Sequence, residues 1–279
     1  MSSTAEVTGT QPTSEIRTVV VAGQSLRVAV RAGDPDRTPL LLCCGIGASF
    51  EVWQPFVDAL DPRIPVIRFD VPGVGGSPVG PVPYLFAGNA YLAARMVRDL
   101  GYDTVDVLGL SWGGALAQQL AVQHASMVRR LILVGTATGW MMVPGHPRVL
   151  LRMLTPRRYR DPEYAAKIAG ILYGGSARER PDHIKRLLGD SLRVGSRTGY
   201  LHQLIAGLGW TSLPFLRLIR QRTLVLGGDD DPIVPLINAR ILRSGIPNAR
   251  LHVYEGGHVS LVTDAGDLVP VIEEFLTEL

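Results

Sequence analysis

The chain has 279 residues, of which 46% are hydrophobic and 19% charged, with a formal net charge of +3. A chain of this length buries roughly three quarters of its surface on folding, and it fits one α/β domain with an insertion as well as two domains. The basic residues are scattered apart from a few arginines between 148 and 160. This pattern lacks the dense basic stripe of nucleic-acid binders, so no nucleic-acid partner is expected. The sequence does not indicate an oligomeric state.

The first 15 residues are rich in serine and threonine and are expected to form a disordered tail. They contain no apolar stretch, so no signal peptide is expected, and no segment has the length of a transmembrane helix. The only cysteines, Cys43 and Cys44, are adjacent in an apolar run, which favours reduced buried thiols over a disulfide or a zinc site. We therefore expect a soluble protein of the cytoplasm.

Short β-branched runs alternate with helical patterns along most of the chain. Ile16–Val21 and Leu26–Val30 predict a hairpin. A continuous apolar run at 39–44 is typical of a buried parallel strand, and 66–70 is interpreted in the same way. Further strands are predicted at 105–108, 130–134, 223–226 and 251–254. Helical spacing of apolar residues covers 84–100, 113–124, 235–244 and the segment that ends at Leu279. The alternation predicts an α/β fold, a parallel sheet with helices on both faces.

The alternation stops between residues 139 and 210. This stretch shows helical patches broken by proline and glycine, and it contains no convincing strand. It therefore predicts a helical cap inserted between two strands. The predicted domain organisation is a tail at 1–15, a core at 16–138 and 211–279, and a cap at 139–210.

A candidate nucleophile lies between the strand predicted at 105–108 and the helix that follows it. Residues 109–113 read Gly-Leu-Ser-Trp-Gly, with Ser111 at the centre. In this strand–turn–helix context the glycines allow a sharp turn that exposes the serine hydroxyl. The following helix directs its amino-terminal amides at the same point. We therefore expect Ser111 to act as a nucleophile.

The base and acid that a serine nucleophile needs are expected at the ends of later strands, in the order acid and then histidine. His258 follows the last predicted strand in a glycine loop, where ligand and catalytic groups gather in open α/β sheets. The preceding strand ends in Asp229, Asp230 and Asp231, and only one of these can face the imidazole. Asp231 is the candidate acid, and the other two are interpreted as solvated or turn-forming side chains.

Two glycine loops resemble cofactor motifs without matching them. The first loop, at 45–50, begins like a dinucleotide fingerprint, but Phe50 stands where a third small residue is required. The second loop, at 73–76, also follows a predicted strand, but Pro78 breaks the spacing of the fingerprint. The chain also lacks a phosphate-binding Gly-Lys-Ser/Thr motif and a His-Glu-x-x-His metal motif. No nucleotide, metal or other cofactor is expected. The first loop is interpreted as an oxyanion loop, with the Ile46 amide as one donor and the Trp112 amide as the other.

Ser111, Asp231 and His258 match the catalytic triad of the α/β-hydrolases, which the chain resembles. More closely, the chain resembles the intracellular medium-chain-length polyhydroxyalkanoate depolymerases. The segments that carry this resemblance are Phe69-Asp-Val-Pro-Gly-Val-Gly-Gly-Ser77, Gly109-Leu-Ser-Trp-Gly-Gly-Ala-Leu-Ala-Gln-Gln119, Tyr173-Gly-Gly175, Ala206-Gly-Leu-Gly-Trp-Thr-Ser212 and Gly228-Asp-Asp-Asp-Pro-Ile-Val-Pro-Leu-Ile-Asn238. One departure is Cys44, which precedes the oxyanion-loop glycine where an asparagine is expected in the depolymerases. A thiol is a weaker hydrogen-bonding anchor than an amide.

The resemblance implies an eight-stranded, mostly parallel α/β-hydrolase fold and a polyester substrate, attacked through an acyl-enzyme on Ser111. It also suggests an association with intracellular polymer granules. A general carboxylesterase or lipase, and a cofactor-free perhydrolase or haloperoxidase, remain alternatives because they use the same triad. The residues expected to line the acyl pocket are Trp140, Met141, Met142, Leu150, Met153 and Leu154.

Overall fold

A computed structural model describes residues 13–187 and 195–278 of the chain. Its eight strands form one sheet in the order β1-β2-β4-β3-β5-β6-β7-β8. β1 and β2 pair antiparallel, as do β2 and β4, and every other neighbouring pair is parallel. The strands are β1 (Glu15–Val21), β2 (Gln24–Arg31), β3 (Leu40–Cys43), β4 (Val66–Phe69), β5 (Val105–Leu110), β6 (Val128–Val134), β7 (Arg222–Gly228) and β8 (Ala249–Tyr254). The predicted mostly parallel eight-stranded sheet is confirmed.

The central strands β3, β4 and β5 are buried along their whole length, on both faces of the sheet, because successive side chains of a strand point to opposite sides. In β3, Leu40 and Leu42 belong to one hydrophobic core, whereas Leu41 and Cys43 belong to the other. The first core lies under α1 (Gln54–Ala59), α9 (Ser260–Thr263) and α10 (Ala265–Thr277). The second lies under α2 (Phe86–Asp99), α3 (Trp112–Gln123) and α8 (Ile237–Gly245). Helices therefore cover both faces, as predicted.

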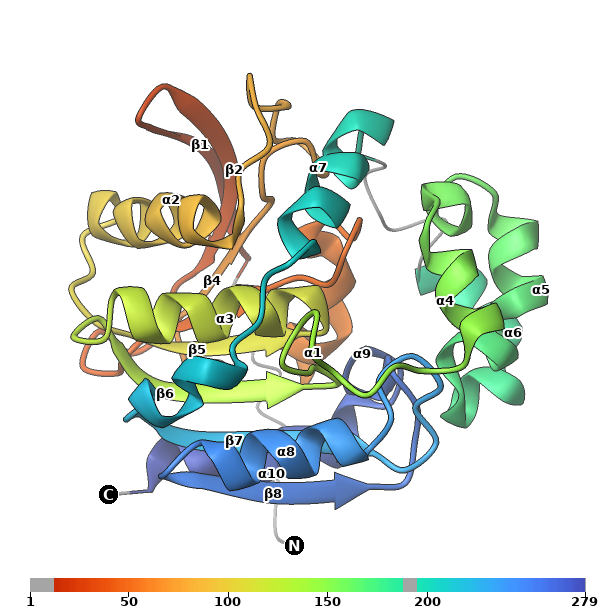
Figure 1. The fold of residues 1–279 in the computed structure, drawn as a ribbon. Coiled ribbons are helices and arrows are strands. Elements are labelled where there is room, and N and C mark those ends of the chain that lie inside the picture. Colours follow the sequence, from red (N-terminus) through yellow and green to blue (C-terminus); the bar gives the residue numbers. More distant parts are fainter. Residues whose placement is uncertain (1–12, 188–194, 279) are drawn as a thin grey trace, which may run out of the picture.

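The described parts of the inserted segment, residues 139–187 and 195–210, lie beyond the carboxyl ends of the strands, where the arrowheads of β6 and β8 point in Figure 1. Its elements are α4 (Pro147–Met153), η2 (Pro156–Tyr159), α5 (Pro162–Tyr173), η3 (Gly175–Arg178), α6 (Pro181–Lys185) and α7 (Arg197–Gly207), and the short helices η1 (Phe50–Trp53) and η5 (Leu213–Leu218) lie outside it. Gly139 and Thr211 pair as an isolated antiparallel bridge, and Trp140 N donates to Trp210 O. The inserted segment thus begins and ends at neighbouring points, after β6 and before β7.

Several boundaries differ from the sequence predictions by a few residues. Glu15 already belongs to β1, so the strand includes the last residue of the predicted tail, while residues 1–12 of that tail lie outside the described ranges. The single predicted carboxyl-terminal helix is broken at Asp264 into α9 and α10. No helix in the described ranges is long and apolar enough to span a bilayer.

Candidate active site

Ser111 occupies a sharp turn between β5 and α3. Its backbone has φ 56° and ψ −118°, a conformation that costs energy for a residue with a side chain. The hydroxyl of Thr136 donates to Ser111 O at 2.7 Å, and the Ser111 amide donates to Val134 O at 2.9 Å. These bonds hold the strained turn against the end of β6. The turn is the geometry that a nucleophile elbow requires.

The glycines of the motif are required by the close approach of neighbouring backbone. A Cβ at Gly109 would lie 2.3 Å from Gly113 O, and a Cβ at Gly113 would lie 2.1 Å from Cys43 O. Any larger residue at either position would push the helix away from the sheet. The Gly-x-Ser-x-Gly spacing therefore allows α3 to start directly against β3 and β5.

Asp231 and His258 meet at the carboxyl ends of β7 and β8. His258 Nδ1 lies 2.7 Å from Asp231 Oδ2, and both side chains are almost fully buried. The other carboxylate oxygen accepts from the amides of Ile233 and Val234, each at 2.9 Å. These two bonds hold the carboxylate in one orientation, so its second oxygen faces the imidazole.

The two neighbouring aspartates have other partners. Asp230 forms an ion pair with Arg178 and accepts from the Gly175 amide at 2.7 Å. The hydrogen bond from Arg178 holds the pKa of Asp230 below its ordinary value. Asp229 accepts from the Gly256 amide at 3.0 Å and so supports the loop that carries His258. Asp230 is half exposed to solvent, in line with its interpretation as a solvated side chain, and it also binds the inserted segment to the core.

The Tyr173-Gly-Gly175 motif packs between the loops that carry the candidate acid and base. The His258 amide donates to Tyr173 O at 2.7 Å. A Cβ at Gly174 would lie 1.9 Å from Asp230 O, and a Cβ at Gly175 would lie 2.3 Å from Gly257 N. Only glycines allow the inserted segment to approach both loops this closely. The motif thus fixes the relative position of Asp231 and His258.

The loop after β3 forms a tight turn beside Ser111. The Ala48 amide donates to Gly45 O at 3.2 Å, and Gly47 has φ +76°, the left-handed value that this turn requires. A Cβ at Gly45 would lie 3.6 Å from Ser111 Cβ, so the loop and the serine are in close proximity. Within the described ranges, the amides of Ile46 and Trp112 donate to no protein acceptor. They are therefore available as the candidate oxyanion donors.

Side chains of the inserted segment support this loop, a role that the sequence analysis missed. Tyr159 Oη donates to Ile46 O at 2.8 Å, and Gln203 Oε1 accepts from the Gly47 amide at 2.7 Å. The backbone oxygen of Gln203 also accepts from Trp112 Nε1 at 3.0 Å. Gln203 therefore contacts both the oxyanion loop, at Gly47, and the residue that follows Ser111, Trp112. No local pattern marked it, because the contact spans 156 positions of the chain.

Cys44, which stands where an asparagine is expected before the oxyanion-loop glycine, contacts a tryptophan. Its Sγ accepts from Trp53 Nε1 at 3.1 Å. Burial raises the pKa of the Cys44 thiol well above its ordinary value and that of Cys43 to about 12. Both thiols stay protonated, which excludes them as nucleophiles near neutral pH. The oxyanion loop depends on the inserted segment rather than on Cys44.

Two cavities meet at Ser111. The smaller, of about 40 Å³, is lined by Ser111 and His258 together with Met153, Arg158 and Tyr173. The larger, of about 180 Å³, is mostly apolar, and its lining residues are Phe86, Ser111, Trp112, Ala115, Thr136, Ala137, Gly139, Met142, Leu150, Gly207, Trp210, Ile233 and Val234. The sequence analysis missed Phe86 and Trp210, whose rings lie 4.7 Å apart.

Of the predicted pocket residues, Met142 and Leu150 line the larger cavity and Met153 the smaller. Trp140 and Met141 do not line either cavity and are 66% and 57% exposed. Leu154 is also exposed. The prediction that Trp140, Met141 and Leu154 line the pocket is therefore wrong. Trp140 and Met141 lie in a turn closed by the Met142 amide on Gly139 O, and consecutive side chains of a turn do not share one direction.

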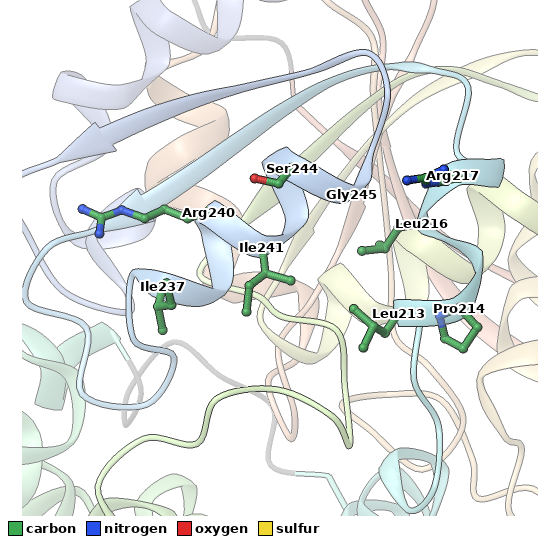
Figure 2. A pocket seen from close by; sticks show the side chains of 9 residues that line it. All are labelled: Leu213, Pro214, Leu216, Arg217, Ile237, Arg240, Ile241, Ser244 and Gly245. Carbon is green, nitrogen blue, oxygen red and sulfur yellow. The ribbon is translucent and has the colours of Figure 1, made fainter.

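Figure 2 shows a more spacious groove, of about 490 Å³, between η5 and α8. Its lining residues include Ser244 but neither a histidine nor a carboxylate. A serine in that setting has no base among its neighbours. The groove is therefore not the candidate site, despite its size.

The arrangement around Ser111 is suited to acyl transfer. It combines a strained serine, an oriented imidazole–carboxylate pair and two amides without protein acceptors. No hydrogen bond joins the side chains of Ser111 and His258 within the described ranges, a contact that commonly tightens when substrate binds. Over the same ranges, no three potential metal ligands come together.

Comparisons with known proteins agree with this geometry. Residues 38–169 match the family model of the alpha/beta hydrolase fold. The chain is 50% identical over 262 residues to the poly(3-hydroxyalkanoate) depolymerase of Ectopseudomonas oleovorans, covering 94% of this chain and 92% of the relative. The enol-lactonase of Burkholderia xenovorans shares the fold with a TM-score of 0.80 at 24% identity, covering 94% of this chain and all (100%) of that one. An esterase of Exiguobacterium antarcticum matches with a TM-score of 0.77 at 20% identity, covering 96% and 100%. The chain is thus a hydrolase of the α/β-hydrolase superfamily and belongs to the family of the Ectopseudomonas depolymerase.

Proposed function

We propose that this protein depolymerises medium-chain-length poly(3-hydroxyalkanoate) by hydrolysing its ester bonds through an acyl-enzyme on Ser111. The observation that carries the proposal is the position of Ser111 between the Asp231–His258 pair and an apolar cavity of about 180 Å³. The 50% identity to a poly(3-hydroxyalkanoate) depolymerase over 94% of the chain supports the same substrate class.

In the proposed reaction, His258 removes the Ser111 proton while the hydroxyl oxygen attacks the ester carbonyl. Asp231 holds the imidazole in the tautomer with its proton on Nδ1 and stabilises the cation that forms. The amides of Ile46 and Trp112 bind the negative charge that develops on the carbonyl oxygen. His258 then protonates the leaving alcohol. A water molecule hydrolyses the acyl-enzyme by the same sequence of proton transfers.

The larger cavity suits an aliphatic chain. Met142 and Leu150 supply flexible apolar walls, and Phe86 and Trp210 supply aromatic ones. Each methylene that a substrate buries there contributes up to about 0.8 kcal/mol, or roughly fourfold in affinity. A chain of several methylenes is therefore favoured over the methyl group of an acetyl ester.

We also propose that residues 139–210 form a cap domain over a core at 16–138 and 211–279. The pairing of Gly139 with Thr211 at the base of the insertion supports these bounds. Association with intracellular polymer granules, in the cytoplasm, is part of the proposal because the substrate is an insoluble polyester.

The experiment is to incubate the purified protein with a latex of poly(3-hydroxyoctanoate) and with a latex of poly(3-hydroxybutyrate). Clearing and release of hydroxyacids are measured, and nitrophenyl acetate and octanoate are hydrolysed in parallel. We expect the octanoate polymer to clear faster and kcat/KM to rise from acetate to octanoate. Ester hydrolysis without release of hydroxyacids from either latex would contradict the proposal and leave a general esterase. Peroxide-dependent oxidation in place of hydrolysis would indicate a perhydrolase.

A further inference from the structure

The smaller cavity contains a buried arginine whose charge has no counterpart. Arg158 is 1% exposed, and it lines the cavity together with Ser111 and His258. Across residues 13–187 and 195–278 no carboxylate pairs with it, and its Nε has no hydrogen-bond partner. An arginine keeps its proton at any accessible pH. Burying such a charge without an anion is costly. A buried charge that the protein leaves unpaired is expected at a functional site, where a ligand supplies the anion.

The contacts that Arg158 makes within the protein are neutral. Its Nη1 donates to Tyr200 Oη at 3.0 Å, and its Nη2 donates weakly to Ile46 O at 3.4 Å. The guanidinium also lies 4.4 Å from the centre of the Tyr159 ring. Burial raises the pKa of Tyr200, so this phenol stays uncharged. These contacts orient the guanidinium but leave its charge uncompensated.

A second buried donor lines the same cavity. Tyr173 is 3% exposed, and its hydroxyl interacts with the Arg158 guanidinium but donates to no acceptor in the described ranges. Burial raises the pKa of Tyr173, so the hydroxyl keeps its proton and can donate. A guanidinium and a phenol without an acceptor at one small cavity match the oxygens of a carboxylate. The volume of about 40 Å³ suits a group of a few heavy atoms, such as a carboxylate with its adjacent methylene.

We propose that Arg158 and Tyr173 bind the free carboxylate at the end of a polyester chain, so that the enzyme removes the terminal hydroxyacid unit. This inference rests on the proposed function and specifies its substrate. In a 3-hydroxyacid the carboxyl carbon is three bonds from the alcohol oxygen, so a terminal unit brings its carboxylate close to the last ester bond. His258, which protonates the leaving alcohol, lines the smaller cavity and not the larger one. The leaving unit therefore belongs on the side of Arg158.

The proposed step breaks one ester bond and consumes one water molecule. Ser111 Oγ bonds to the carbonyl carbon of the penultimate unit, and the bond from that carbon to the terminal unit's 3-oxygen breaks. His258 transfers the serine proton to this oxygen, and the terminal hydroxyacid leaves with its carboxylate unchanged. One water molecule then releases the shortened chain, which ends in a new carboxylate. The product can thus bind at the same site again.

The test compares a dimer of 3-hydroxyoctanoic acid as the free acid and as its methyl ester. For the wild-type protein, we expect kcat/KM for the acid to exceed that for the methyl ester at least tenfold. Arg158→Met should reduce this ratio by ten- to a hundredfold, as for the loss of a hydrogen bond to a charged group. Tyr173→Phe should reduce it several-fold. The matched control is Arg157→Met, because Arg157 is the neighbouring arginine with a side chain 61% exposed, and the ratio should stay at the wild-type value.

Equal rates for acid and methyl ester in the wild type would overturn the proposal. An equal loss for both dimers in Arg158→Met, with their ratio preserved, would also overturn it, because Arg158 would then only support the loop at Ile46. If Arg158→Met does not fold, Tyr173→Phe decides, because a hydroxyl that donates to no acceptor can be removed without leaving an acceptor unsatisfied.

A binding measurement separates this inference from the proposed function. Calorimetry with Ser111→Ala should show that the acid binds at least tenfold more tightly than the methyl ester, and equal binding would contradict the carboxylate site. If neither dimer is hydrolysed while nitrophenyl octanoate is, the polyester function fails. The calorimetric comparison still decides in that case whether Arg158 and Tyr173 recognise a carboxylate.

Discussion

Replacing Asp231 with asparagine is expected to lower kcat for ester hydrolysis by about 10⁴-fold. The structure indicates why the loss should be so large. Asp231 Oδ1 accepts from two backbone amides, at Ile233 and Val234, so an asparagine is expected to keep its oxygen there. Its NH₂ group then faces His258 Nδ1, which lies 2.7 Å from Oδ2 in the present structure.

An NH₂ group at that position donates to Nδ1, and the imidazole proton must move to Nε2. The nitrogen that should accept the Ser111 proton is then no longer a base. The imidazolium also loses the carboxylate that stabilises it. A 10⁴-fold loss corresponds to about 5 kcal/mol of transition-state stabilisation. The assay is the initial rate of nitrophenyl octanoate hydrolysis over a range of substrate concentrations, with a thermal melt to confirm that the variant is folded.

The neighbouring aspartates supply matched controls with the same change of charge. Asp230→Asn weakens a half-exposed pair with Arg178 that is worth about 1 kcal/mol at most, or roughly fivefold. Asp229→Asn retains an oxygen that can accept from the Gly256 amide. Both variants should keep kcat within about fivefold of the wild type. A larger loss for Asp230→Asn than for Asp231→Asn would refute this assignment of the acid.

Four further outcomes are expected. Ser111→Ala should reduce hydrolysis by four to six orders of magnitude, roughly the effect at other triad serines, and a fluorophosphonate should label the wild type at Ser111 alone, as mass spectrometry can show. Gln203→Leu should lower kcat by up to about 10²-fold with little change in KM, because it releases the loop beside one oxyanion donor; an unchanged kcat would show that the loop holds without it. Leu150→Trp should fill the larger cavity and shift the preference of kcat/KM from octanoate toward acetate by about tenfold or more, and an unchanged preference would place the acyl chain elsewhere. Because burial raises the pKa of Cys43 to about 12, iodoacetamide at pH 8 should leave this thiol unmodified until the protein is denatured, and rapid labelling of the native protein would contradict its burial.

The sequence by itself determined the fold class and the candidate triad, because the signals for both are local. A short continuous apolar run such as Leu40–Cys43 is typical of a strand covered on both faces. The motif around Ser111 combines a strand, two required glycines and a helix within a few residues, so its geometry can be inferred without distant contacts. His258 was identified in the same way, from its place directly after the last strand.

Only the tertiary structure decided what surrounds these residues. Trp140 and Met141 are apolar and lie in the inserted segment, yet a turn directs them to the surface. Gln203 and Arg158 show no motif, because their partners Gly47 and Ile46 lie 156 and 112 positions away in the chain. Composition cannot distinguish such residues from ordinary surface polar groups. Their roles follow from packing between the inserted segment and the sheet, where burial removes water and leaves each polar atom to be satisfied by the protein or by a ligand.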